Sequence, residues 1–196
     1  MPLRKDMARS AIAVIVFSLL LGLVYPLVVT GISQVLFAEA ADGSRIESDG
    51  RVVGAELIGQ DFGGRPRYFQ SRPSATGYSA DVTYFNNLGP NNRELSRYFA
   101  EQLAAYLKRE GPYNRGLTRA DVPVDAVTTS ASGVDPHISE ANARIQARRV
   151  AAVRGLRLDR VRDLVAENTD GRFLGVLGEP GVNVLQLNLA LDEEGR

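Results

Sequence analysis

The sequence predicts an α+β protein in which one N-terminal transmembrane helix is followed by a single extracytoplasmic α+β domain. Three observations predict this class. Residues 11–37 carry no charged side chain, the rest of the chain mixes helical and strand-like apolar periods, and no linker or repeat divides residues 51–196. We therefore expect a cytoplasmic N-terminus at 1–10, a transmembrane helix at 11–37, a tether at 38–50 and one domain at 51–196.

The apolar stretch is long enough to cross a membrane. At ~1.5 Å per residue a helix over 11–37 rises about 40 Å, against a hydrocarbon core of roughly 30 Å. Gly22 and Pro26 are tolerated in membrane helices. Two alternatives compete. A cleaved secretory signal would have a shorter apolar region, and a buried helix of a soluble core would keep a polar face.

The flanking charges predict the orientation of this helix. Arg4, Lys5 and Arg9 precede it with only Asp6 to oppose them. The positive-inside rule then leaves the N-terminus in the cytoplasm and the domain outside it. The chain has no cysteine and no net charge. These properties predict no disulfide framework, no thiolate metal site and no nucleic-acid partner.

Small or polar residues recur at every fourth position of the apolar stretch. They are Ser18, Gly22, Pro26, Thr30 and Gln34, which we call the ridge. Small residues at this spacing let another helix approach closely, and helix association in lipid depends on such packing. The ridge therefore predicts a partner-helix face. The alternative is that such residues are simply frequent in membrane helices.

The domain begins with two predicted strands. Residues 52–59 and 67–71 are rich in β-branched and aromatic side chains, and the glycines and proline of 60–66 must form a turn between them. Residues 74–92 follow as a long irregular loop. Loops of that length in a compact domain usually serve function or binding.

A helix is predicted over 93–110. Asn91 and Glu94 have the spacing of a capping box, in which each side chain satisfies a free backbone N–H group of the first turn. Apolar residues three and four apart form one stripe that we expect to face the core. The stripe consists of Leu95, Tyr98, Phe99, Leu103, Tyr106 and Leu107.

The next predicted elements are a strand over 122–131 and a helix over 140–154. Ser139 has the position of the helix N-cap, and Gly155 ends the helix. The residues expected to face the core are Ile145, Ala152 and Val153, and those expected on a basic outer side are Arg144, Arg148, Arg149 and Arg154.

Two more elements complete the predicted domain. A short helix over 160–167 follows Asp159 as a candidate cap. A glycine-rich turn then leads to residues 182–192, in which leucines alternate with Gln186, Asn188 and other residues. Such alternation predicts a half-buried strand.

One group of residues imitates a catalytic site. In a hydrolase of this kind Asp orients His, and His deprotonates Ser, so Ser132, Asp135 and the only histidine, His137, have suitable side chains. Such residues normally converge from separate elements, whereas these belong to one loop. Zinc also needs more ligands than one histidine with scattered carboxylates. We predict neither a catalytic nor a metal-binding residue.

We interpret the same loop as a rigid interface for a partner. Asp135 and Pro136 favour a fixed turn, and Ser139 begins the next helix. The candidate interface residues are Ser132, Gly133, Asp135, Pro136, His137 and Ser139.

Five motifs in a fixed order then point to a family. They are LIGQDF, RYFQSRPSA, NLGPNN, VPVDAVTTSASGVDPHIS with IQARRVA after it, and LGEPGVNVLQLNLALD. With the basic-flanked N-terminal span they resemble the C subunit of the bacterial Kdp potassium-transporting ATPase. The resemblance covers nearly the whole chain.

The resemblance implies a non-catalytic subunit of a four-subunit complex in the bacterial inner membrane. The implied partners are a potassium-translocating subunit, an ATP-hydrolysing P-type subunit, a small single-span subunit and membrane lipid. The family is described as a catalytic chaperone that raises the ATP affinity of the ATP-hydrolysing subunit. The resemblance assigns ATP and potassium to the complex as a whole: the complex uses ATP and transports potassium. No cofactor is expected on this chain.

The sequence departs from the family pattern at two places. Residues 83–92 read TYFNNLGPNN where the family is close to SGGSNLGPTN, and Gly181 stands where arginine is common. The predicted topology also separates the domain from cytoplasmic ATP. It favours a role near the ion entry on the outer face, with any effect on ATP affinity transmitted through the span. The alternatives are a membrane-anchored extracytoplasmic hydrolase and an anchored binding module built on residues 74–92.

Overall fold

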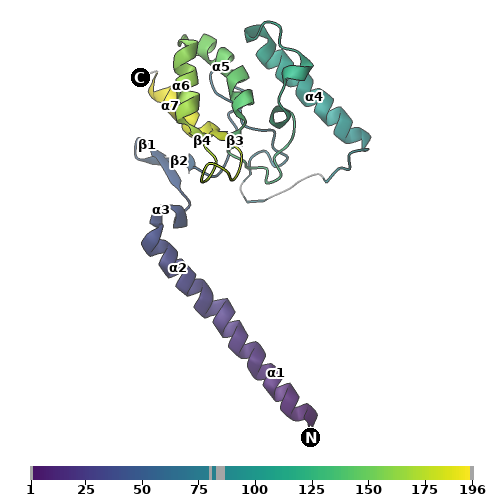
Figure 1. Cartoon of the computed structure of the whole chain (residues 1–196), viewed down its shortest axis with the longest axis vertical. Coiled ribbons are helices and arrows are strands. Elements are labelled where there is room, and N and C mark those ends of the chain that lie inside the picture. Colours follow the sequence, from purple (N-terminus) through teal and green to yellow (C-terminus); the bar gives the residue numbers. More distant parts are fainter. Residues whose placement is uncertain (1, 80, 83–86, 195–196) are drawn as a thin grey trace. The chain divides into compact units, whose positions relative to one another are not determined.

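In the computed structural model the chain forms two compact units, residues 1–45 and 46–196 (Figure 1). The structure describes residues 2–79, 81–82 and 87–194. Residues 83–86, which belong to the segment 83–92 that departs from the family pattern, lie outside the described residues.

The first unit is a helix with one widened turn. It consists of α1 (Pro2–Leu19), a π-helical turn η1 (Leu20–Val24) and α2 (Tyr25–Leu36). Pro26 explains the widening, because it has no N–H group and its ring would clash with the carbonyl four residues earlier. Tyr25 accordingly donates to Leu20 O, five residues back. In the described part of the chain this is the one helix long and apolar enough to cross a membrane.

The predicted tether contains regular structure. The short helix α3 (Ala38–Ala41) ends the first unit, and β1 (Arg45–Ser48) pairs with β2 (Arg51–Ala55) in a two-stranded sheet. The predicted strand over 52–59 therefore exists only in its first half.

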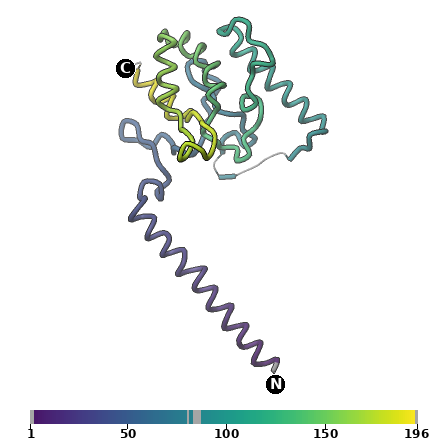
Figure 2. Tube along the Cα trace, in the orientation of Figure 1, coloured from purple at the N-terminus to yellow at the C-terminus, as the bar shows by residue number. Residues whose placement is uncertain are grey.

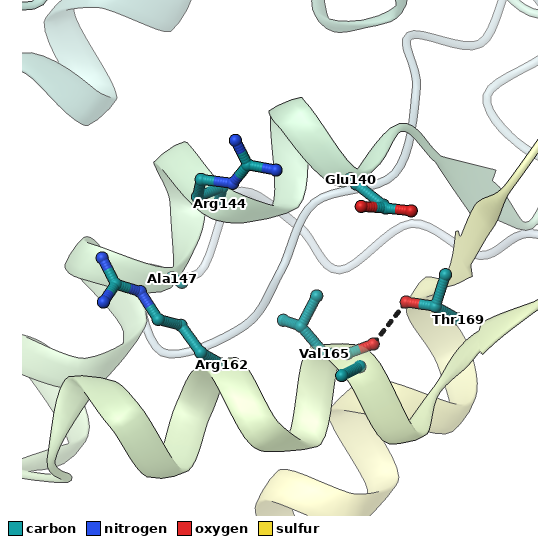
Figure 3. Close-up of a pocket in the computed structure, with 7 residues that line it drawn as sticks. Glu140, Arg144, Ala147, Arg162, Val165 and Thr169 are labelled. Atoms are coloured by element: carbon teal, nitrogen blue, oxygen red, sulfur yellow. Dashed lines mark hydrogen bonds between the residues drawn. The ribbon is translucent and has the colours of Figure 1, made fainter.

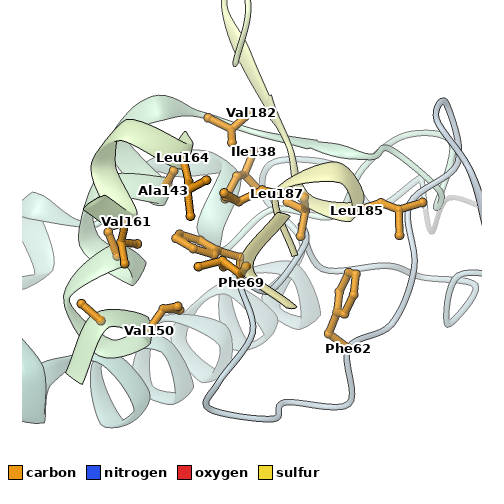
Figure 4. Close-up of a cluster of buried hydrophobic side chains, with 14 residues drawn as sticks. Phe62, Phe69, Ile138, Ala143, Val150, Val161, Leu164, Val182, Leu185 and Leu187 are labelled. Atoms are coloured by element: carbon orange, nitrogen blue, oxygen red, sulfur yellow. The ribbon is translucent and has the colours of Figure 1, made fainter. Parts of the chain in front are cut away.

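The core of the domain lies between three helices and a small antiparallel sheet. The helices are α5 (Glu140–Arg154), α6 (Leu158–Glu167) and α7 (Val184–Glu193). The sheet has the order β3 (His137–Ile138), β5 (Gly181–Asn183) and β4 (Thr169–Asp170), with Val182 opposite both Ile138 and Thr169. Phe69, fully buried, lies within the cluster of apolar side chains from these elements (Figure 4). The mixed helix-and-sheet architecture confirms the α+β class.

Helix α4 (Arg93–Glu110) has the predicted bounds but a different cap. Asn92, not Asn91, is the N-cap, and its side chain accepts a hydrogen bond from the Glu94 N–H group at 2.8 Å. Only Tyr106 and Glu110 of this helix are buried. The rest of the predicted apolar stripe is half-buried, because α4 lies at the edge of the domain (Figure 1).

The predicted strand over 122–131 is wrong. Its residues form the 3₁₀ turn η4 (Val124–Ala126) and irregular chain, following two similar turns, η2 (Gly111–Tyr113) and η3 (Arg119–Asp121). Pro123 begins η4, and its carbonyl accepts from Ala126 N at 3.1 Å. A turn therefore uses the backbone groups that a strand would have paired.

The predicted strand over 67–71 is not part of a sheet, because side-chain amides take the place of a partner strand. Asn188 accepts from Phe69 N at 2.9 Å and donates to Phe69 O at 3.0 Å. Gln146 does the same for Gln70, at 2.8 and 3.0 Å. The backbone of this segment is hydrogen-bonded, but its partners are side chains of α7 and α5.

The predicted strand over 182–192 is correct only at its start. After Asn183 the chain turns into α7, and the Asn183 side chain caps that helix by accepting from Gln186 N at 3.1 Å. The buried residues of α7 follow helical spacing rather than alternation. They are Val184, Leu185, Leu187, Asn188 and Leu191.

Helix α5 buries a different face from the predicted one, and helix α6 has a different cap residue. The core face of α5 consists of Ala143, Ala147, Val150 and Ala151, whereas Ala152 and Val153 are exposed. Arg149 is buried instead of lying on a basic outer side. Helix α6 begins two residues earlier than predicted, so Arg157 rather than Asp159 is its cap residue.

Candidate functional site

The loop over residues 132–139 is packed tightly against two earlier segments. Gly59 donates its N–H group to Val134 O at 2.7 Å, and a Cβ atom on Gly59 would lie 2.5 Å from Asp135 O. Ser74 donates to Gly133 O at 2.6 Å, and Gly133 has φ +77°, a conformation that favours glycine. The loop is therefore held rigidly by the chain around it.

The predicted turn at Asp135 and Pro136 is present. Asp135 Oδ1 accepts from His137 N at 2.9 Å, which closes an Asx turn, and its Oδ2 accepts from the Arg72 guanidinium at 3.0 Å. The Pro136 carbonyl accepts from Val184 N at 3.0 Å, at the start of α7. The turn thus joins the segment of Arg72 to the start of α7.

His137 lies between two carboxylates. Its Nε2 is 2.8 Å from Asp170 Oδ2 on β4, and its Nδ1 is 3.7 Å from Asp135 Oδ1. The Asp135 carboxylate raises the pKa of His137 most, partial burial opposes the rise, and Asp170 adds to it. Burial alone would raise the pKa of Asp135, but hydrogen bonds from His137 and Arg72 outweigh it and lower that pKa. The contact between His137 and Asp170 therefore connects the loop to β4.

The geometry around Ser132 does not match a nucleophile and its base. The Ser132 hydroxyl accepts from Val134 N at 3.2 Å, within its own turn. Both ring nitrogens of His137 face carboxylates. These three side chains thus stabilise the loop. Among the described residues, no group of three or more histidines and carboxylates is arranged to hold a metal ion.

The Ser139 cap is confirmed, and it belongs to a larger polar cluster. Ser139 Oγ accepts from Asn142 N at 3.1 Å and donates to Asp125 Oδ1 at 2.7 Å. Asp125 also accepts from Ser139 N at 2.9 Å and from the Asn142 side chain at 3.0 Å. Sequence reasoning missed Asp125, because residues 122–131 were expected to form a strand.

Gly181 contacts His137 across the sheet. A Cβ atom at position 181 would lie 3.1 Å from the His137 Cβ atom and 3.3 Å from its ring. Because Gly181 has no side chain, the His137 side chain can pack against the backbone of β5. An arginine here, as the family resemblance suggests, would have to displace that ring.

We predict that His137 makes the stability of the domain depend on pH. Because the pKa of His137 is raised on folding, its contribution is fully present below the unfolded pKa, about 6.5, and is lost as pH rises through the folded value. The wild type should therefore lose part of its free energy of unfolding as pH rises above that range, whereas His137→Gln should lose less. Urea titrations of both chains at several pH values measure this. Parallel profiles for the two would contradict the prediction.

A groove between α5 and α6 is a second surface feature, which the sequence did not reveal (Figure 3). It encloses about 530 Å³ above the small apolar side chains of Ala147, Val165 and Ala166. Arg144 and Arg162 lie on its rim, with Glu140 and Thr169 toward the end nearer the sheet (Figure 3). Arg144 was placed correctly on the outer side of α5. The depth of the groove depends on α6, which sequence reasoning did not pair with α5.

The widened turn in the apolar helix brings the ridge residues closer to one face than a regular helix would. In a straight α-helix, positions four apart advance by about 40°, so a ridge from Ser18 to Gln34 would rotate by roughly 160°. The turn η1 holds more residues per turn and reduces this rotation. A shallow hollow on the helix also includes two members of the ridge. It is lined by Ala13, Val14, Phe17, Ser18, Leu21 and Gly22.

Comparison with known proteins agrees with the family resemblance. Residues 7–193 match the family model KdpC, described as K+-transporting ATPase, c chain. A protein of Rhodospirillum rubrum is 53% identical over 178 residues, covering 90% of this chain and 89% of its own length. One from Methylococcus capsulatus is 50% identical over 186 residues (93% and 95%), and one from Koribacter versatilis is 46% identical over 192 residues (97% and 95%). All three are named potassium-transporting ATPase KdpC subunit.

Proposed function

Because the chain belongs to the KdpC family, the c chain of K+-transporting ATPases, we propose that it is an accessory subunit of a high-affinity, ATP-driven potassium uptake complex. Its partners are the potassium-translocating subunit, the ATP-hydrolysing P-type subunit and the small single-span subunit. The family match over residues 7–193 carries this proposal. The apolar helix supports it, since its length and composition suit a membrane span.

The chain acts in this complex as a catalytic chaperone that raises the ATP affinity of the ATP-hydrolysing subunit. The helix α1–η1–α2 carries the effect, because ATP binds on the cytoplasmic side and the folded domain lies on the other. Coupling of this kind typically changes an affinity by about 5–150-fold. The turns and carboxylate pairs around His137 make the 132–139 loop a preformed contact surface for a partner.

The test compares the complex purified with and without this chain. Potassium-stimulated ATPase activity should show a KM for ATP that is about 5–150-fold higher without it. Adding the full chain back should restore the lower value. An unchanged KM in a complex that otherwise assembles would exclude the chaperone role, and failure of the chain to copurify with the other subunits would exclude the accessory role.

We expect the N-terminus in the cytoplasm and the domain outside it. Arg4, Lys5 and Arg9 are the physical reason, since basic flanks remain on the cytoplasmic side. A reporter that is active only in the periplasm should work when fused after Arg196 and fail when fused before Arg4. The reverse pattern of activity would contradict this orientation.

We also expect the ridge to be a helix-packing face. A Cβ atom on Gly22 meets nothing within 4 Å, so Gly22→Leu fits its own helix and changes only what an approaching helix encounters. Recovery of the other subunits from detergent should fall several-fold for Gly22→Leu, because the added side chain prevents close approach. Leu20→Ala is the control and should have a smaller effect. Equal recovery of both variants would mean that the ridge is ordinary membrane composition.

A further inference from the structure

The hairpin that joins β4 to β5 exposes four large apolar side chains at one tip. Phe173 is 69% exposed, Leu174 78%, Val176 72% and Leu177 58%. Figure 2 shows this segment as a yellow-green loop at the edge of the domain. Sequence reasoning treated it only as a glycine-rich turn. Isolated apolar residues on a surface need no explanation, but a contiguous group on a small domain marks an interaction site.

The hairpin is preformed rather than a loose loop. Phe173 and Leu177 exchange backbone hydrogen bonds of 2.8 and 3.0 Å, and the Arg172 carbonyl accepts from Gly175 N at 2.9 Å. Leu174 has φ +52°, which a residue with a side chain rarely adopts. A leucine held in this conformation is presented to solvent by the turn itself. A rigid apolar tip loses little freedom on binding, which is how interface anchors gain affinity.

The charges of the hairpin indicate what it contacts. Arg172 and Glu179 are the charged residues between Gly171 and Gly181, and they form an ion pair of 2.8 Å across its base. The tip therefore carries no net positive charge for anionic lipid, whereas segments that bind membrane surfaces are usually rich in lysine and arginine. An apolar centre with a neutral polar rim is instead typical of a protein–protein anchor.

We infer that the 173–177 hairpin tip is an anchor that inserts into an apolar pocket of another subunit of the K+-transporting ATPase complex, an inference that rests on the accessory role proposed above. The residues of the anchor belong neither to the 132–139 loop nor to the ridge. It provides the domain with a contact of its own beside that of the membrane helix.

Matched variants of the full chain test the anchor. Val176→Ser and Leu174→Asn should each lower recovery of the other subunits about tenfold or more, as expected for an anchor residue. Asn tolerates the left-handed conformation, so Leu174→Asn should leave the domain folded, which a thermal melt checks. Val124→Ser is the control, because Val124 is also 72% exposed but lies on η4. Recovery of Val176→Ser and Leu174→Asn equal to that of Val124→Ser would overturn the inference.

A fluorescent probe identifies the occupant. The chain has no cysteine, so Val176→Cys and Val124→Cys can each be labelled with bimane at one site. Emission at position 176, but not at 124, should shift to the blue only when the other subunits are added to the full chain in nanodiscs. A shift in phosphatidylcholine–phosphatidylglycerol nanodiscs without them would assign the tip to lipid. A shift that grows with the concentration of the chain alone in detergent would assign it to a second copy.

Either result, or no shift in an assembled complex, refutes the anchor while the accessory role stands. Failure of the unlabelled wild-type chain to assemble refutes that role itself.

Discussion

Replacing Arg149 by alanine is expected to lower the free energy of unfolding of the domain by about 3–5 kcal/mol. Arg149 is 1% exposed, and its Nε donates to the two carboxylate oxygens of Glu110, itself 0% exposed, at 3.0 and 3.1 Å. The same guanidinium donates to the carbonyls of Pro66 and Tyr68 and to Gln146 Oε1. Its removal leaves these buried acceptors without their partner.

Glu110 keeps one partner in that variant, because Arg109 donates to its Oε1 at 2.9 Å. The loss therefore comes mainly from the desolvated carboxylate and the backbone carbonyls that Arg149 had satisfied. Urea unfolding of the full chain in detergent, followed by circular dichroism, measures the change. Arg148→Ala, on the exposed side of α5, is the control and should stay within about 0.5 kcal/mol.

A double replacement separates the pair from its surroundings. Glu110→Gln with Arg149→Met removes both charges together and should recover part of the stability lost in Arg149→Ala, since no unpaired charge remains. A loss below about 1 kcal/mol for Arg149→Ala would mean that water reaches Glu110 in the folded domain. The buried pair would then contribute little to the contact between α4 and α5, which Tyr106 and Asn142 also join.

Arg149 also shows why part of the fold could not be predicted. Arginine at this position of an amphipathic helix normally faces water, and nothing local distinguishes it from Arg148. Its burial depends on Glu110, which is 39 positions earlier in the chain, and on carbonyls of the segment before Phe69. Pairing over such distances is a property of the folded domain.

Elements with strong local signals were predicted well. The apolar helix, the bounds of α4 and α5, the Ser139 cap and the Gly155 stop all rest on neighbouring residues. The last element was not, because Leu185, Leu187, Leu189 and Leu191 alternate as in a strand, whereas the buried set of α7 includes Val184 and Asn188 and leaves Leu189 half-buried. The informative signal was Asn183 with Gln186 three residues later, the spacing of a helix cap.

For the 132–139 loop, the sequence predicted the turn and the helix cap. It did not predict the side chains from other segments that bond the loop. Asp135 and Pro136 form the expected turn because both act on the adjacent backbone. Arg72, Asp125 and Asp170 come from separate segments, and no spacing in the sequence places them beside the loop, where they bond Asp135, Ser139 and His137 respectively. Sequence reasoning thus found the rigid loop and missed the charges that hold it.

Replacing Asn188 by leucine is expected to cost about 2–6 kcal/mol of the free energy of unfolding. Asn188 is 2% exposed, and its amide both accepts from Phe69 N and donates to Phe69 O, at 2.9 and 3.0 Å. Leucine has nearly the same size and shape, so little cavity forms. The cost arises because two buried backbone groups lose their partner, at ~1–3 kcal/mol for each.

Amide hydrogen exchange distinguishes this cause from a general loosening of the core. In Asn188→Leu the exchange of the Phe69 amide should rise more than that of the other buried amides, because its acceptor has gone while the apolar packing around it remains. Gln186→Leu, on the same helix but half-exposed, is the control and should cost about 1 kcal/mol or less. If Asn188→Leu keeps both its stability and the protection of Phe69, another group satisfies that backbone. The side-chain amides would then not stand in for the missing strand.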